Sequence, residues 1–236
     1  MLIVLTFLVA LAPQKTTLAE DNLPAFEDYV FYSSWGGDGK QIVEPADVAI
    51  GDNGKVYIAN TNFNRITMID PDGYIYNEIG GVGSGDGSFN YISSVAVNAA
   101  GEIYVADAWN HNIQKFDASG NHLLTWGGYG SEVGRLNGPS GLALDSEGNV
   151  YVADSGNDRI QKFTADGIFL RALGSQGIYN NQFYSPRDIA INSIGEIFVA
   201  DTFNSRIQRF TANWEHILTI QIKDSIYGET ILKPFG

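Results

Sequence analysis

One pattern recurs four times in this chain, and each copy begins 47 residues after the previous one. Four apolar residues are followed by Asn or Asp, at Val56–Asn60, Ile103–Asp107, Val150–Asp154 and Ile197–Asp201. A glycine upstream and an isoleucine downstream keep the same register in every copy. Strand-rich repeats of about 40 to 50 residues build propeller blades or solenoid units. The period therefore restricts the fold to stacked copies of one small unit.

Each repeat reads as four short β-strands. In the third copy, residues 142–144 and the continuous apolar run 150–153 predict two strands, the second covered on both faces. Residues 159–163 alternate charged and apolar side chains and predict a half-exposed third strand, and 168–173 predict the outer strand. Because one such sheet cannot bury both of its faces, neighbouring units must pack on each other.

The composition supports an all-β chain and excludes several functions. Glycine is frequent at 27 residues, aromatic residues make up 12% and charged residues only 17%, as expected for short strands and tight turns. The absence of cysteine excludes disulfides, a thiol nucleophile and cysteine-ligated metals. A net charge of −13 repels phosphate backbones, so we expect no nucleic-acid partner.

The first 19 residues differ from the repeats. Leu2–Ala12 is an apolar run interrupted only by Thr6, shorter than the about 20 residues of a membrane span. Thr17-Leu18-Ala19 supplies a cleavage site, although no Lys or Arg precedes the run. We predict a signal peptide and a secreted, periplasmic or cell-surface location, without a transmembrane span. A buried first strand and a misassigned start codon are the alternatives.

The repeats resemble those of NHL-repeat proteins. The resemblance is carried by Tyr151–Asp154 with Asn157 and Arg159–Gln161, and again by residues 198–208. The second copy departs at Asn112, where Arg is expected, and the first copy at Asn60 and Phe63. The resemblance implies a β-propeller of four-stranded antiparallel blades, usually six, and it covers residues 29–221.

The number of copies is smaller than that resemblance implies. Six blades would need about 280 residues. We expect four repeats at 45–91, 92–138, 139–185 and 186–221. Residues 20–44 would form a leader and an outer closing strand, and 222–236 the start of a further blade. An incomplete six-bladed ring, as a truncated frame or fragment, would expose apolar blade faces open to self-association. A four-bladed ring or intermolecular closure is the alternative.

A polar motif accompanies every repeat, and we assign it a structural role. A catalytic site is used once, whereas these side chains recur in each copy and would satisfy one another and the turn backbone. The motif residues are Asn60, Arg65, Asp107, Asn110, Asp154, Asn157, Arg159, Asp201, Asn204 and Arg206.

The other candidate phosphate-binding and metal-binding motifs are incomplete. The glycine-rich stretches 80–87 and 127–134 precede strands rather than helices, so they are connections and not phosphate loops. Asp70–Gly73 begins like a calcium loop but lacks the twelfth-position Glu. The three histidines do not form a zinc motif. We predict no catalytic residue, no metal site and no cofactor, and leave calcium or magnesium on the propeller axis open.

Ligand recognition is expected where the repeats differ. In a propeller, the turns after the second strands and the segments entering the first strands lie on one face. There Trp109 and Phe203 replace Asn62 and Gly156 of the other copies and are suited to stack on a ligand. Packing between adjacent loops is the alternative. The full candidate set is Trp109, Phe203, Arg187, Asp188, Asp47 and His111.

The favoured function is a binding scaffold for a protein, peptide or glycan. The alternative is part of a metal-dependent propeller lyase or lactonase-like hydrolase, to which the resemblance also extends. Such a site needs carboxylates from several blades, and Asp47 and Asp188 are available. RNA binding, a third alternative, would need a basic face.

Overall fold

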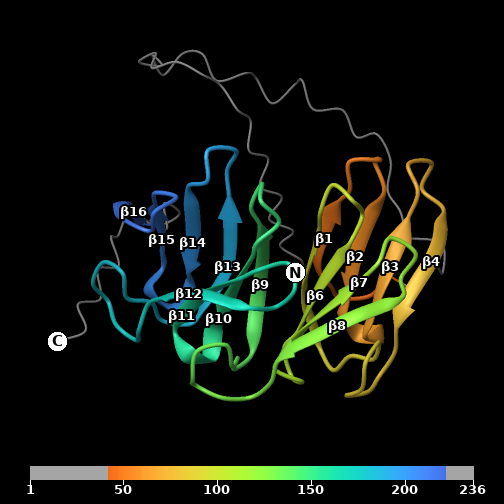
Figure 1. Cartoon of the computed structure of the whole chain (residues 1–236), viewed down its shortest axis with the longest axis horizontal. Helices are drawn as coiled ribbons and strands as arrows, with labels where there is room; N and C mark the ends of the chain where they lie inside the picture. Colours follow the sequence, from red (N-terminus) through yellow and green to blue (C-terminus); the bar gives the residue numbers. More distant parts are fainter. Residues whose placement is uncertain (1–41, 222–236) are drawn as a thin grey trace, which may run out of the picture. The chain divides into compact units, whose positions relative to one another are not determined.

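The computed structural model describes residues 42–221, in which four antiparallel sheets of four strands form four blades (Figure 1). Strands consecutive in sequence are neighbours in each sheet. Blade 1 holds β1 (Pro45–Ile50), β2 (Val56–Asn60), β3 (Arg65–Ile69) and β4 (Ile75–Gly80); blade 2 holds β5 (Ile92–Val97), β6 (Ile103–Asp107), β7 (Asn112–Phe116) and β8 (His122–Gly127). Blade 3 holds β9 (Pro139–Leu144), β10 (Val150–Asp154), β11 (Arg159–Phe163) and β12 (Phe169–Leu173); blade 4 holds β13 (Pro186–Ile191), β14 (Ile197–Asp201), β15 (Arg206–Phe210) and β16 (His216–Gln221).

The predicted all-β class with propeller-type blades is confirmed, and one detail is wrong. The strand β11 is largely buried rather than half-exposed. Its charged side chains reach partners inside the blade, since Arg159 pairs with Asp154 at 2.7 Å and Lys162 with Asp145 at 2.9 Å. The predicted signal peptide, the closing strand at Tyr29–Gly37 and the start of a further blade lie outside the described residues.

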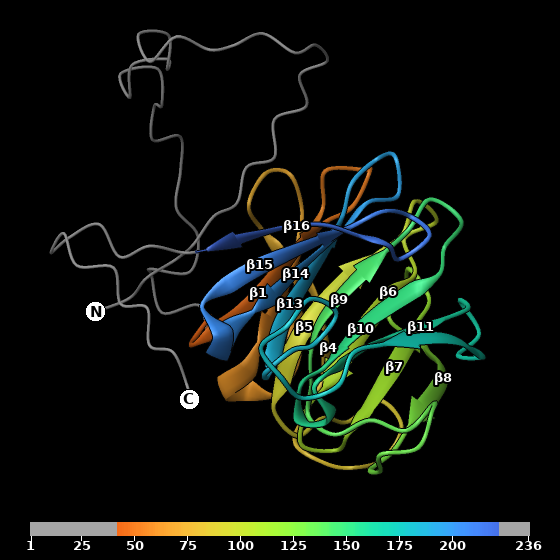
Figure 2. The same cartoon turned by 90° about the vertical axis from the view of Figure 1, so that its left-hand side faces the viewer.

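Neighbouring blades pack through apolar clusters. The first strands β1, β5, β9 and β13 follow one another, and Figure 2 shows β5, β9 and β13 side by side. Val95 of β5 packs among Tyr57 and Ile66 of blade 1 and is 3% exposed. Its counterpart Val48 in β1 is 58% exposed. The repeat thus places the same apolar position on the side that faces the preceding blade.

The turn between second and third strands ends on a residue with left-handed backbone in every blade. Asn64, His111 and Asp158 have φ of 50°, 57° and 52°. Their side chains accept the backbone N–H of the segment that enters the next blade, at 2.5, 2.9 and 2.7 Å. This contact links each blade to the next.

The two ends of the blades carry different segments. We call the end that holds the turns after the second strands and the connections 81–91, 128–138 and 174–185 the connection face. The opposite end, which holds the turns after the first and third strands, is the turn face. No helix within residues 42–221 is long and apolar enough to cross a membrane.

Candidate functional site

The motif Asp of blades 3 and 4 is the centre of a polar network. Asp154 is buried and accepts hydrogen bonds from Asn137 N at 2.7 Å, Asn157 Nδ2 at 2.9 Å and Arg159 Nε at 2.7 Å. Gln161 Nε2 donates to the same carboxylate at 2.9 Å. These polar side chains are therefore hydrogen-bonded to one another within the blade.

Blade 4 repeats the arrangement, with Asp201 accepting from Tyr184 N and Arg206 Nε at 2.7 Å each. Asn204 Nδ2 lies 2.9 Å from one oxygen of that carboxylate. In both blades, the asparagine also donates to the preceding connection, at Gly130 O and Gly177 O. The motif therefore fixes the conformation of the connection and leaves no carboxylate free for chemistry.

Blades 1 and 2 each contain half of this charge pair. In blade 1, Asn60 replaces the acid, and Arg65 turns to Glu78 at 2.8 Å. In blade 2, Asp107 is fully buried but Asn112 stands where Arg is expected. Burial raises the pKa of Asp107 to about 6, against hydrogen bonds from the neutral donors of Asn90, Asn110 and Gln114.

The inner-strand candidates lie at a bulge near the start of each first strand. The register of β1 with β2 shifts between Pro45 and Asp47, and that of β13 with β14 between Pro186 and Asp188. The candidate position is the first paired residue after the bulge, and it is polar in three of the four blades. The four residues are Asp47, Ser94, Gly141 and Asp188.

Hydrogen bonds connect these inner positions from blade to blade. Asp47 Oδ2 accepts from Ser94 Oγ at 2.5 Å and from Val95 N at 3.0 Å, and Ser94 Oγ accepts from Leu142 N at 3.1 Å. Gly141 leaves room for the next residue, since a Cβ there would lie 2.9 Å from Asp188 Oδ1. Asp47 is therefore engaged by blade 2.

Asp188 accepts fewer hydrogen bonds from the described residues than Asp47 does. Its Oδ1 accepts Ile189 N at 2.8 Å, and the residue is exposed to solvent although Gly141 lies against its Cα. Burial raises its pKa to about 6, and the charge of Asp47 raises it further in the same direction. The pKa of Asp47 is also raised by burial, in spite of its hydrogen bonds from Ser94 and Val95.

Two aromatic pairs stand on the connection face. The ring of Trp109, 62% exposed, stacks on Tyr91 with centroids 5.1 Å apart and planes 11° from parallel. Phe203, 53% exposed, meets Tyr184 edge-on at 5.1 Å, and the Arg187 guanidinium lies 5.8 Å from its centroid. Trp109 and Phe203 thus contact a neighbouring loop and still present more than half of their surface.

His111 has a structural partner. Its Nδ1 accepts Gly138 N of the next connection, and its ring packs against Tyr129 at 4.9 Å. Sequence reasoning missed Tyr91 and Tyr184, because the connections in which they lie align without repeating an aromatic residue. The only available signal was their position just before a first strand on the same face as the candidates.

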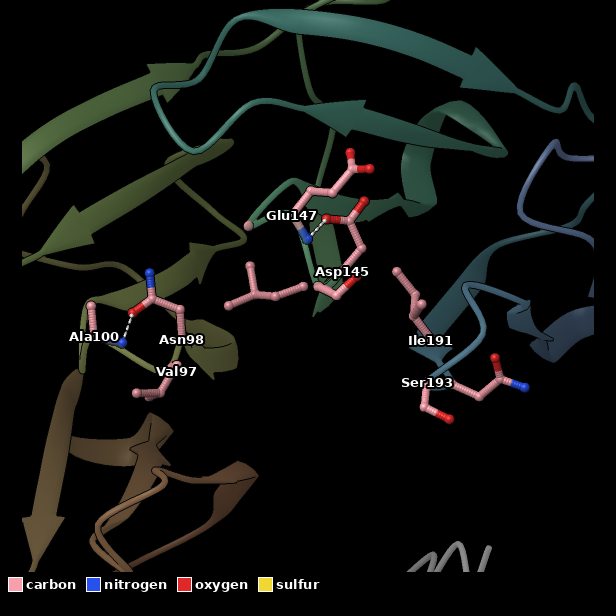
Figure 3. Close-up of a pocket in the computed structure, with 12 residues that line it drawn as sticks. Val97, Asn98, Ala100, Asp145, Glu147, Ile191 and Ser193 are labelled. Carbon is pink, nitrogen blue, oxygen red and sulfur yellow. Dashed lines mark hydrogen bonds between the residues drawn. The ribbon is translucent and has the colours of Figure 1, made fainter. Parts of the chain in front are cut away.

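The turn face contains a cavity of about 570 Å³ between blades 2, 3 and 4 (Figure 3). It is lined by the turns after the first strands, including Asn98, Asp145 and Glu147. Their side chains cap their own turns, with Asn98 Oδ1 accepting Ala100 N and Asp145 Oδ1 accepting Glu147 N, both at 3.0 Å. These contacts build hairpins and supply no converging catalytic set.

The described residues 42–221 contain no cluster of three His, Asp or Glu side chains suited to a metal ion. Asp47, Asp188 and the Ser94 hydroxyl are oxygen donors at equivalent positions of three blades, and Ser94 already donates to Asp47. Oxygen donors of this kind suit calcium or magnesium rather than zinc.

Comparison with known proteins identifies the repeat. The model of the NHL repeat matches residues 89–116, 136–163 and 183–210, so the predicted NHL resemblance is confirmed. No curated protein matches the chain.

Solved structures share the fold at low identity. A streptogramin B lyase is 20% identical with a TM-score of 0.58, over 75% of this chain and 54% of that protein. A catalytically inactive virginiamycin B lyase from Staphylococcus aureus with quinupristin is 19% identical with a TM-score of 0.60, over 78% of this chain and 58% of that protein. Hydrazine synthase from Kuenenia stuttgartiensis is 16% identical with a TM-score of 0.59, over 81% of this chain and 52% of that protein. The chain thus spans little more than half the length of these proteins, and the likeness concerns the fold.

Proposed function

We propose that this NHL-repeat chain is a non-catalytic binding module that presents its connection face to a protein, peptide or glycan. The repeated acids, amides and guanidinium groups are engaged in holding the connections. What differs between blades on that face is the set of exposed aromatic and charged side chains. A rigid repeated scaffold with variable loops is suited to recognition.

The two aromatic pairs carry this proposal. Trp109 and Phe203 are each oriented by a tyrosine yet keep more than half of their surface exposed. A ring already held by a neighbour loses little conformational freedom on binding, which makes such aromatic residues effective contact points. The Arg187 guanidinium over Phe203 adds a cation beside the second pair.

Direct binding to peptide and glycan arrays tests the proposal. The full chain is compared with Trp109→Ala and Phe203→Ala, and with Tyr74→Ala as the matched control. Tyr74 is 64% exposed in a turn of the turn face. Ligands that lose binding in the first two variants but not in the control support the connection face. Equal binding by all four proteins contradicts it.

A second candidate, a metal-dependent lyase or hydrolase-like activity, is favoured by one observation. Asp47 and Asp188 are acidic groups from blades 1 and 4 whose pKa values are both raised, and the charge of Asp47 contributes to the raised pKa of Asp188. A divalent cation between them would relieve that repulsion. A saturable rise in melting temperature with micromolar calcium, absent in Asp188→Asn, would support this candidate over the first.

We also propose export of the chain, which rests on the apolar run and cleavage site within residues 1–19. Fractionation of expressing cells, with mass determination of the mature N-terminus, tests it. A chain that retains Met1 in the cytosolic fraction contradicts export.

A further inference from the structure

Blades 3 and 4 each contain a receptor for one guanidinium group. The Arg159 side chain donates to Asp154 Oδ2, Ser131 O, Glu132 O and Arg135 O at 2.7 to 2.8 Å. In blade 4, Arg206 makes the four corresponding bonds, to Asp201 Oδ2 and to the carbonyls of Ile178, Tyr179 and Gln182. One carboxylate and three backbone carbonyls thus surround a planar cation, twice, in the same way.

Blade 2 contains the acceptor groups of this receptor. Its corresponding acceptors are the Asp107 carboxylate and the carbonyls of Ser84, Gly85 and Ser88, each 47 residues before its blade 3 counterpart. The connection is held by the same backbone hydrogen bonds as the other two. Gly83 N donates to Phe89 O. The equivalent bonds in the next two connections are Gly130 N to Leu136 O and Gly177 N to Phe183 O. Ser88 N likewise donates to Gly85 O, and the equivalent bond before blade 3 is Arg135 N to Glu132 O. The carbonyls therefore stand in the arrangement that binds Arg elsewhere.

The cation itself is missing from blade 2. Asn112 occupies the position of Arg159 and Arg206, paired in register with Asp107 as those residues are with their acids. Its side chain is shorter and neutral, and its Oδ1 is buried without a hydrogen-bond partner. The donors to Asp107 are Asn90 N, Asn110 Nδ2 and the Gln114 amide, all uncharged. The buried Asp107 carboxylate therefore has neutral donors and no cation among the described residues, and the buried Asn112 Oδ1 has no donor among them.

The outer edge of the blade 2 site is exposed to solvent, whereas the Asp107 carboxylate at its centre is buried. Ser84 and Gly85 are exposed, and Trp109 belongs to the same turn as Asp107 and Asn110. Trp109 is 62% exposed, and an exposed indole in the same turn can attract a cation. The net charge of −13 further favours a basic ligand.

We propose that blade 2 binds the guanidinium group of an arginine side chain supplied by a peptide ligand. The peptide part of this proposal rests on the proposed function, because it names the ligand class of the connection face. The guanidinium site itself does not depend on that function. Arginine fits better than lysine because its planar group presents donors in several directions at once, as Arg159 and Arg206 do toward the four corresponding acceptors of their own blades. The raised pKa of Asp107 agrees with a carboxylate that lacks a cationic partner.

The probe is N-acetyl-arginine amide, titrated in the millimolar range into the full chain and followed by melting temperature and by isothermal calorimetry. Its lysine counterpart and urea serve as controls. At a tenfold excess over its dissociation constant, the arginine probe is expected to raise the melting temperature by about 3 to 5 °C. The controls should give no saturable shift.

Two variants decide whether blade 2 is responsible. Asn112→Arg fills the receptor from within the chain, and Asp107→Asn removes its charge. Each should weaken binding of the probe at least about tenfold, while Asn112→Ala, which supplies no cation, should retain it. Undiminished binding in Asn112→Arg, or an equal response to the lysine probe, overturns the proposal. Saturation by sodium or calcium chloride without arginine would assign the site to a metal ion and also overturn it.

Trp109→Ala separates this inference from the proposed function. If the connection face binds peptide but blade 2 takes no guanidinium, array ligands lose affinity in Trp109→Ala while the arginine probe fails in the wild-type chain. If blade 2 binds guanidinium and the face is not a peptide surface, the probe binds and no array ligand does.

Discussion

Blades 2 and 3 share the backbone hydrogen bonds of their preceding connections and differ in the charges around the motif aspartate. Both surround a buried aspartate with an asparagine three residues later and a glutamine seven residues later, and both hold the preceding connection through them. Only blade 3 adds an arginine, which reaches the carboxylate and three carbonyls. In blade 2, that position is Asn112.

The conformation of the connection does not depend on the arginine charge in these two blades. The connections of the two blades share their backbone hydrogen bonds whether or not a guanidinium is present. Amide side chains and the backbone are therefore sufficient for the conformation, and the arginine neutralises a charge that burial makes unfavourable. A repeat can lose its arginine and keep its fold, which leaves a charged receptor unfilled.

The largest expected effect is loss of the acid in blade 3. Asp154→Ala leaves Arg159, Asn157 and Gln161 without their acceptor, and we expect a loss of about 3 to 5 kcal/mol in the free energy of unfolding. Urea unfolding followed by circular dichroism measures it. Arg159→Asn converts the site to the blade 2 pattern and should cost less. If the two variants are equally destabilised, the arginine is needed for the fold, and blade 2 is not a blade 3 that has lost only its charge pair.

The pH dependence of stability tests the unpaired acid of blade 2. The pKa of Asp107 is raised from 3.8 to about 6, so the folded chain holds a proton that the unfolded chain releases between these values. The contribution of Asp107 to the free energy of unfolding is therefore fully present below pH 4. It is lost as the pH rises through 6, and the loss is on the order of 3 kcal/mol. Asp107→Asn, which copies Asn60 of blade 1, should remove that part of the slope in urea unfolding at pH 4 to 7. An unchanged slope would assign it to other groups.

Asn112→Arg should make blade 2 like blade 3. The new guanidinium would meet the Asp107 carboxylate and the three carbonyls of the connection, and we expect a gain of about 1 to 2 kcal/mol at pH 7. The gain should shrink at pH 4, where Asp107 is protonated. Urea unfolding at both pH values measures it, with Asn112→Lys as the control for charge alone. Destabilisation by Asn112→Arg at pH 7 would show that the two connections differ in shape.

The smallest effect on stability is expected at the exposed aromatic residues. Trp109→Ala removes a ring that is 62% exposed and should change the free energy of unfolding by no more than about 0.5 kcal/mol. The same variant should abolish binding of any ligand of the connection face. A large loss of stability would show that the stack on Tyr91 serves the fold.

The blade elements could be predicted closely, and the site only in part. The strands followed from Val150–Asp154 and its copies because apolar runs and glycine turns are local signals. The burial of β11 could not be seen from Arg159 and Lys162, since their partners lie elsewhere in the fold. His111 was predicted to contact a ligand, and its hydrogen bond from Gly138 N in the next connection could not be seen in the sequence.

By itself, the sequence determined the period, the four-stranded unit and the positions at which the copies differ, because a repeat of 47 residues constrains every copy to bury the same face. The tertiary structure decided which polar side chains are already engaged. The sequence shows that Arg159 of blade 3 is replaced by Asn112 in blade 2. Only the structure shows that three carbonyls of the preceding connection surround the Arg159 guanidinium together with Asp154. Partners more than 20 residues apart in the chain come together through blade packing, which local sequence patterns do not encode.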